Sequence, residues 1–401
     1  MNLKKHINIA LAYFIIAAVL GVVLRSFHSF EIPVNYKFIV HTHSHIALLG
    51  WVYLGLTTLL YKLFLERQEL DLKYRRIFWF TQITLVGMLL TFPFQGYAIL
   101  SIIFSTLFLI ASYWFAGFFM KYVPSSNRKT NSYQCAKYAL WYMVLSSLGP
   151  WTLGAIMNTL GAESIWYRLS IYFYLHFQYN GWMILGLLGV FIYVTEYNEI
   201  EIPKKTFNRF FWLINLGIVL TFSLSTLWTK PPIFFYVIGG LGAMLQIMAF
   251  GILLLLAIGR QEKLFQILTP LQKNLLVTVV VLVGIKILLQ FLTAFPYFAE
   301  LAALITDFTI GYLHWIFLGV VTIGLILFLD YFELLKLSKS SYYLYLSGFL
   351  LTEILIFTKG ILAWQGESLF KGYFEVLAIS SFLLPLSLVF LMVANLKGKS
   401  D

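Results

Sequence analysis

Twelve long apolar runs, separated by short connectors, are the feature that most limits what this chain can fold into. A helix needs roughly 20 apolar residues to cross the hydrocarbon core of a bilayer, and the runs are of that length. They lie at 7–26, 38–64, 77–96, 98–120, 137–160, 168–193, 209–228, 233–258, 274–294, 303–330, 341–363 and 372–395. We therefore predict an all-α integral membrane protein in which residues 1–401 form a single transmembrane bundle.

The composition excludes several other classes of protein. Hydrophobic residues make up 60% of the chain and charged residues 11%, whereas charged residues are about a quarter of an ordinary soluble domain. Such a hydrophobic chain is also not intrinsically disordered. Cys135 is the only cysteine, which rules out an intrachain disulfide, a CxxC metal knuckle and covalent heme attachment. No soluble domain, low-complexity tract or obvious sequence repeat is visible.

The net charge of +11 follows from membrane topology. Nucleic-acid binding would need a clustered basic face on a soluble domain, so we expect no nucleic-acid partner. Of the 28 Lys and Arg residues, 21 fall in connectors on the side of the termini, from Lys4 and Lys5 to Lys397 and Lys399. The positive-inside rule therefore places both termini in the cytoplasm of a multi-pass protein, which we assign to the lipid bilayer of a bacterial inner membrane.

Five of the seven histidines lie inside the apolar runs: His41, His43 and His45 in the second, His176 in the sixth and His314 in the tenth. Ionisable groups at such depths are costly and are candidates for function. At 1.5 Å per residue, His43 is about 8 Å, His176 about 12 Å and His314 about 16 Å from the outer side. Three helices distant in sequence thus place imidazoles in one leaflet, which makes all five histidines candidate metal ligands.

The histidine triplet and His314 together suit a heme. At 100° per residue His41 and His45 lie about 40° apart on one helix face, and His43 points to nearly the opposite side. A six-coordinate heme iron takes one imidazole from each side of the ring, so one triplet member and His314 could hold a low-spin heme b. The alternative is that each histidine hydrogen-bonds to a neighbouring helix.

Twelve spans with histidines on the second, sixth and tenth resemble subunit I of the heme-copper oxidase and nitric oxide reductase superfamily. In this resemblance His41 or His43 corresponds to the low-spin heme ligand of the second span, and His314 corresponds to the low-spin ligand of the tenth. His176 matches the copper-ligand helix, with Tyr179 three residues further on. The resemblance implies a cytochrome oxidase-like fold and a place in respiratory electron transport.

The chain also departs from that family. Tyr312 stands where the high-spin heme ligand is expected, and the seventh span, INLGIVLTFSLSTLW, has no histidine for copper. We therefore do not expect bound copper. Whether the chain is an oxidoreductase of the heme-copper type, which reduces oxygen or nitric oxide, stays open. Membrane hemoproteins of the nitric-oxide stress response, with about twelve spans, are a second resemblance. Both imply a b-type heme.

Three functions follow from these observations. The first is a b-type hemoprotein for electron transfer or for the chemistry or sensing of a diatomic gas, served by an electron-transfer partner in the membrane or the periplasm. The second is a proton- or metal-coupled secondary transporter, and the third is a non-catalytic respiratory accessory protein. Lys286 and Gln290 lie four residues apart on one face of the ninth span, where they either mark a proton route or pair with neighbouring groups.

Overall fold

A computed structural model describes residues 1–397, and these residues form helices connected by turns and short loops. Lys399, which the topology prediction counts on the side of the termini, lies outside the described residues. The chain divides into two compact units, Met1–Val123 with Leu325–Asp401 (unit 1) and Pro124–Gly324 (unit 2). The grouping of residues 1–401 into one domain stays a prediction.

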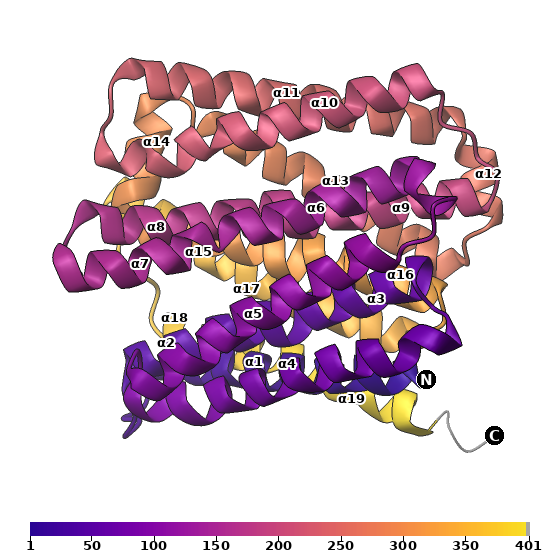
Figure 1. The fold of residues 1–401 in the computed structure, drawn as a ribbon. Helices are drawn as coiled ribbons and strands as arrows, with labels where there is room; N and C mark the ends of the chain where they lie inside the picture. Colours follow the sequence, from indigo (N-terminus) through magenta and orange to yellow (C-terminus); the bar gives the residue numbers. More distant parts are fainter. Residues whose placement is uncertain (398–401) are drawn as a thin grey trace. The chain divides into compact units, whose positions relative to one another are not determined.

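Unit 1 holds the helices from both ends of the chain (Figure 1). They are α1 (Leu3–Ser26), α2 (Tyr36–His45), the π-helix η1 (Ile46–Tyr53), α3 (Leu54–Phe64), α4 (Gln68–Gln95), α5 (Ile99–Tyr122), α17 (Lys339–Gln365), α18 (Tyr373–Ser381) and α19 (Leu383–Lys397). Helix α16 (Thr322–Tyr331) crosses the boundary between the units and lies mostly in unit 1.

Unit 2 holds the central part of the chain. Its elements are η2 (Asn127–Lys129), α6 (Asn131–Ser146), α7 (Leu148–Thr159), α8 (Ile165–His176), the π-helix η3 (Phe177–Ile184), α9 (Leu185–Tyr197), α10 (Lys204–Leu220), η4 (Thr221–Thr229), α11 (Ile233–Gly259), α12 (Gln261–Gln266), α13 (Pro270–Leu292), α14 (Pro296–Leu304), α15 (Thr306–His314) and the π-helix η5 (Trp315–Val321).

Within residues 1–397, twelve helical stretches are long and apolar enough to cross a membrane, and each overlaps one of the twelve apolar runs. The prediction of an all-helical, multi-pass membrane protein is thereby confirmed. Two of these stretches are interrupted where a proline removes a backbone N–H donor. Pro150 leaves the Ser146 carbonyl without its usual partner between α6 and α7, and Pro385 does the same for Ser381 between α18 and α19.

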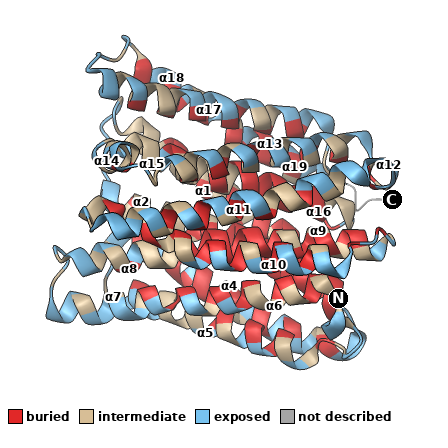
Figure 2. Cartoon of the chain, turned by 90° about the horizontal axis from the view of Figure 1, so that it is seen from above, coloured by how far each residue is buried: buried red, intermediate tan, exposed pale blue. Residues whose placement is uncertain are grey.

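Helix α13 illustrates how these helices begin and which faces they bury. Thr269 caps the helix, because its side chain accepts from the Gln272 backbone N–H while the Gln272 side chain accepts from the Thr269 N–H. One face exposes Leu288 (59% exposed), and the opposite face buries Lys286 (1%). An apolar outer face and a polar buried face are what a lipid environment favours. Figure 2 shows the division of the helices into buried and exposed residues.

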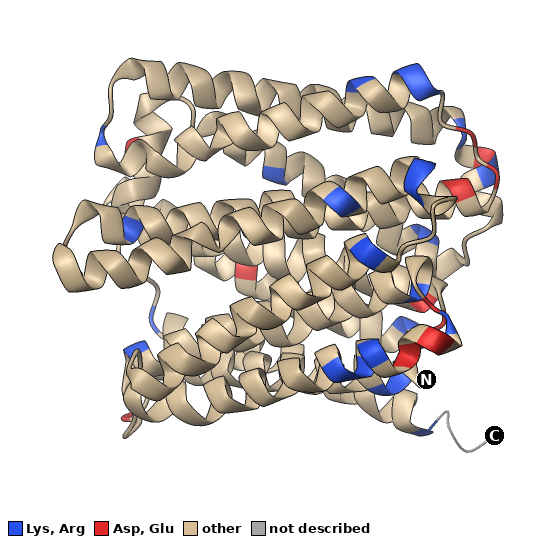
Figure 3. Ribbon diagram, viewed as in Figure 1, with Lys and Arg blue, Asp and Glu red and all other residues tan. Residues whose placement is uncertain are grey.

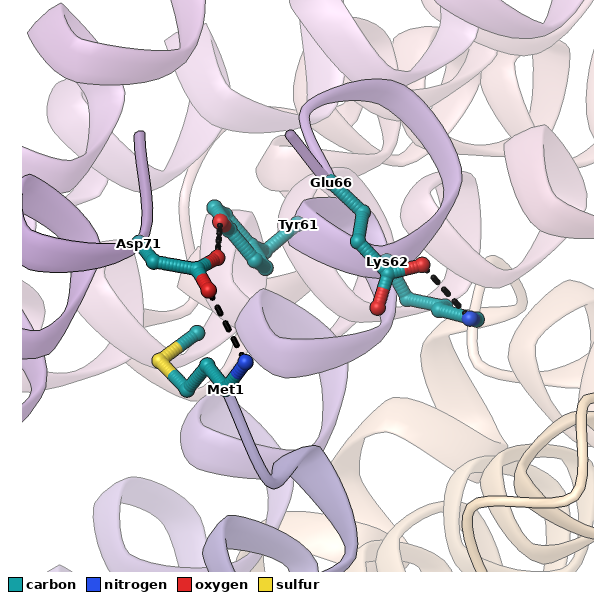
Figure 4. Close-up of polar contacts among 5 residues, drawn as sticks. All are labelled: Met1, Tyr61, Lys62, Glu66 and Asp71. Carbon is teal, nitrogen blue, oxygen red and sulfur yellow. Dashed lines mark hydrogen bonds and ion pairs between the residues drawn. The ribbon is translucent and has the colours of Figure 1, made fainter. Parts of the chain in front are cut away.

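Charged residues in each unit lie mainly near helix ends (Figure 3). One such cluster in unit 1 joins the start of α1 to α3 and α4 (Figure 4). The Met1 amine lies 2.8 Å from Asp71 Oδ2, and the Tyr61 hydroxyl donates to Asp71 Oδ1 at 2.6 Å. Lys62 and Glu66 form an ion pair at 2.5 Å across the end of α3. These contacts fix helix ends, where charged groups can reach water.

Candidate functional site

Three spans change from α-helical to π-helical hydrogen bonding directly after a histidine. Helix α2 ends at His45, α8 at His176 and α15 at His314, and η1, η3 and η5 begin at the next residue. These are the second, sixth and tenth spans, so the junction recurs every four spans. Because π-helical turns are rare and frequently mark functional sites, the three histidines are the leading candidates for function.

The three junctions also share a sequence pattern. Each histidine is followed five residues later by a glycine, Gly50, Gly181 or Gly319. In two of them the next residue is a buried tryptophan, Trp51 or Trp182. No repeat is obvious in the sequence because only these few positions match. The His-x4-Gly spacing is the signal that identifies the repeat once the junctions are known.

In unit 1, His41 and His45 share one face of α2, as their spacing predicts. The ring centroid of His41 lies 4.6 Å from that of Tyr97, and the ring centroid of His45 lies 4.5 Å from that of Phe92. His43 points to α1 instead, where its Nδ1 lies 2.8 Å from the Ala17 carbonyl oxygen. The triplet is therefore divided between an aromatic-lined face and a contact between helices.

Hydrogen bonding fixes the tautomer of His45. Its Nδ1 lies 2.8 Å from the His41 carbonyl oxygen, which can only accept, so Nδ1 carries the proton. A neutral imidazole with a protonated Nδ1 keeps its lone pair on Nε2, the form in which histidine binds metal. The Tyr97 hydroxyl lies 3.4 Å from Nε2, a weak contact. His43 has the same tautomer through its bond to Ala17.

In unit 2, both nitrogens of His176 are engaged by the protein. Its Nε2 donates to the Ile218 carbonyl at 2.8 Å, and its Nδ1 lies 3.4 Å from both Asn180 Nδ2 and Ser225 Oγ. The side chain is 2% exposed. For this histidine the structure favours the alternative of hydrogen bonding between helices.

A cage of amide side chains surrounds Lys286 beside His176. The ammonium Nζ donates to Asn180 Oδ1 at 2.7 Å, to Gln290 Oε1 at 2.5 Å and to Gln246 Oε1 at 3.4 Å. The Tyr312 hydroxyl donates to the same Gln290 oxygen at 3.3 Å. Lys286 and Gln290 do share a face, as predicted, while their partners come from the sixth, eighth and tenth spans.

The histidine triplet has the groups that a heme needs, whereas the surroundings of His176 do not suit a copper ion. Heme iron needs only one imidazole lone pair from each side, and His45 supplies one on an aromatic-lined face. A copper ion at His176 would face the cage of a cationic lysine, and like charges repel. Within residues 1–397, no three His, Cys, Asp or Glu side chains gather closely enough to hold a metal ion.

His314 ends α15 in unit 2, and the indole N–H of the next residue, Trp315, donates to the Leu282 carbonyl at 2.9 Å. This bond fixes the tenth-span junction against α13. The triplet belongs to unit 1 and His314 to unit 2, so their joint ligation of one heme stays a prediction. No protein-family model matches the chain, and no curated protein matches it.

Proposed function

We propose that this chain is an integral membrane b-type hemoprotein, similar in fold to subunit I of the heme-copper oxidases, that serves electron transfer or the chemistry or sensing of a diatomic gas. The observation that carries the proposal is the histidine at the α-to-π junction of the second, sixth and tenth spans. The tautomer of His45, with its lone pair on Nε2, supports it further.

His45 is our first choice for the second-span ligand, and His314 for the opposite one. His41 shares the face of His45 and is the nearest alternative, while His43 serves the contact with α1. When bound, a low-spin b heme supplies a one-electron redox centre. The surrounding protein holds the imidazole tautomer through the His41 carbonyl and lines the face with the rings of Phe92 and Tyr97.

The proposed setting is a bacterial inner membrane with both termini in the cytoplasm, from the distribution of basic residues. The candidate ligands then lie in the outer leaflet. An electron-transfer partner in the membrane or in the periplasm would reach them from that side.

Secondary transport is the second candidate function, and the Lys286 cage favours it. A buried ammonium bonded to side chains from several spans is a common feature of ion pathways. Uptake of substrate by protein-containing vesicles, without heme, would support transport over the first proposal. A stable complex with a respiratory partner, with neither heme nor uptake, would indicate an accessory protein.

The test is a reduced-minus-oxidised optical spectrum with a pyridine hemochrome assay on detergent-purified protein. We expect a b-type signal that is lost in His314→Ala and in His45→Ala. His28→Ala is the matched control, because His28 follows α1 and stacks on Phe374 with ring centroids 4.4 Å apart. A heme-free protein purified from heme-replete cells would overturn the proposal.

A further inference from the structure

Lys286 brings a positive charge into the interior of unit 2 without a carboxylate beside it. Its three acceptors are neutral amide oxygens, and no Asp or Glu oxygen in the described part of the chain lies within 4.0 Å of Nζ. The side chain is 1% exposed, so water does not screen the charge. An ammonium compensated only by dipoles in a region of low dielectric favours the approach of a negative ion.

The same cage has more hydrogen-bond donors than acceptors. Gln290 Oε1 accepts from both Lys286 and Tyr312, but Nε2 of that carboxamide is buried with no partner. Gln290 is 5% exposed, and a buried N–H without an acceptor is costly. An acceptor placed beside Gln290 Nε2 would remove that cost.

A cation does not fit the cage, because the ammonium already takes the amide oxygens that a cation would need. The long contact between Lys286 and Gln246, at 3.4 Å, leaves the third ammonium donor weakly used. A ligand that accepts from this donor and from Gln290 Nε2 is an acceptor, and a negative charge on it would compensate the ammonium. Tyr312, whose hydroxyl donates to Gln290, is itself only partly buried.

We propose that unit 2 binds a small monovalent inorganic anion, of which chloride is the simplest, between the Lys286 ammonium and the Gln290 carboxamide N–H. The anion neutralises the buried charge and satisfies the buried donor at the same time. Neither residue is a proposed heme ligand, so the anion site and the heme are independent.

The experiment is equilibrium binding of radioactive chloride to the purified full chain, together with thermal unfolding in sodium chloride and sodium gluconate at equal ionic strength. We expect saturable binding and a higher unfolding temperature in chloride. Both effects are lost in Gln290→Glu, because a carboxylate at that position pairs with Lys286 in place of the anion. Lys286→Met removes the charge and loses both effects as well.

Gln290→Glu keeps the size and shape of the side chain, so the test does not depend on whether Lys286→Met folds. Gln82→Leu is the matched control: Gln82 is a buried glutamine of unit 1 whose Oε1 has no partner, and this variant keeps chloride binding. Absence of saturable binding by the unmodified protein, or binding retained in a folded Gln290→Glu, overturns the proposal.

Discussion

Gly181 lies so close to α6 that a methyl group there must move the two segments apart. A Cβ on Gly181 would lie 2.5 Å from both Cβ and Cγ of Tyr142, whereas ordinary contact begins at 3.4 Å. The difference, 3.4 − 2.5, requires a movement of about 0.9 Å. Tyr142 Cβ is bonded to the backbone of α6, so changing a rotamer cannot provide that movement.

Gly181→Ala is therefore expected to lower the free energy of unfolding through overpacking, which typically costs about 1–3 kcal/mol. Gly251→Ala in α11 is the matched control, because nothing lies within 4 Å of a Cβ there. Replacing a helical glycine by alanine gains roughly 0.5–1 kcal/mol in either variant, so the difference between the two isolates the steric cost.

The assay is equilibrium unfolding in mixed micelles with an increasing fraction of a denaturing detergent, followed by tryptophan fluorescence. In a Tyr142→Ala background the cost of Gly181→Ala should be smaller but not zero, because alanine removes the Cγ but keeps the Cβ that the new methyl group meets. Equal stability of Gly181→Ala and Gly251→Ala would refute the reasoning.

Two further predictions concern polar contacts at the ends of unit 2 helices. Glu196 accepts from the backbone N–H groups of Asn131 and Ser132 at the start of α6, at 2.8 and 3.3 Å, and from the Ser132 hydroxyl. Glu196→Ala should therefore cost about 1–2 kcal/mol in the same unfolding assay, as lost helix caps do; an unchanged unfolding curve would contradict this. Glu300→Gln should leave the unfolding curve at neutral pH unchanged, because the Lys230–Glu300 pair is exposed and screened. Glu300 raises the pKa of Lys230, so any contribution of the pair to the free energy of unfolding is lost only as the pH rises through that raised pKa. A loss of stability in Glu300→Gln at neutral pH would contradict the expectation.

Hydropathy predicted the spans because a bilayer forces every spanning segment to be both helical and apolar. The ends of the helices were harder to predict. The third span was expected at 77–96, but α4 begins at Gln68. Its first turns carry Asp71, bonded to Tyr61, and Tyr74, bonded to Thr58. A hydropathy window excludes such a polar turn, although its tertiary contacts make it part of the helix.

The candidate site was predicted in part, for a similar reason. Helical spacing is a local property, so it correctly placed Lys286 beside Gln290 and His41 beside His45. The other partners of Lys286 are Asn180 and Gln246, 106 and 40 residues away, which only the packing of the helices brings together. The π-helical turns were missed because hydrophobic periodicity carries no information about a local shift in backbone hydrogen bonding.

The three histidine junctions share one backbone arrangement, and the second-span and sixth-span junctions differ in what holds the imidazole. At the second-span junction the backbone bonds Nδ1 of His45, and the lone pair stays on Nε2. At the sixth-span junction the Ile218 carbonyl accepts a hydrogen bond from His176 Nε2–H, and Asn180 links Nδ1 to the Lys286 cage. A histidine can ligate iron or complete a polar network, but one lone pair cannot do both. The repeated junction therefore favours a division of roles, in which His45 is available to a heme and His176 helps to position the cage proposed to bind an anion.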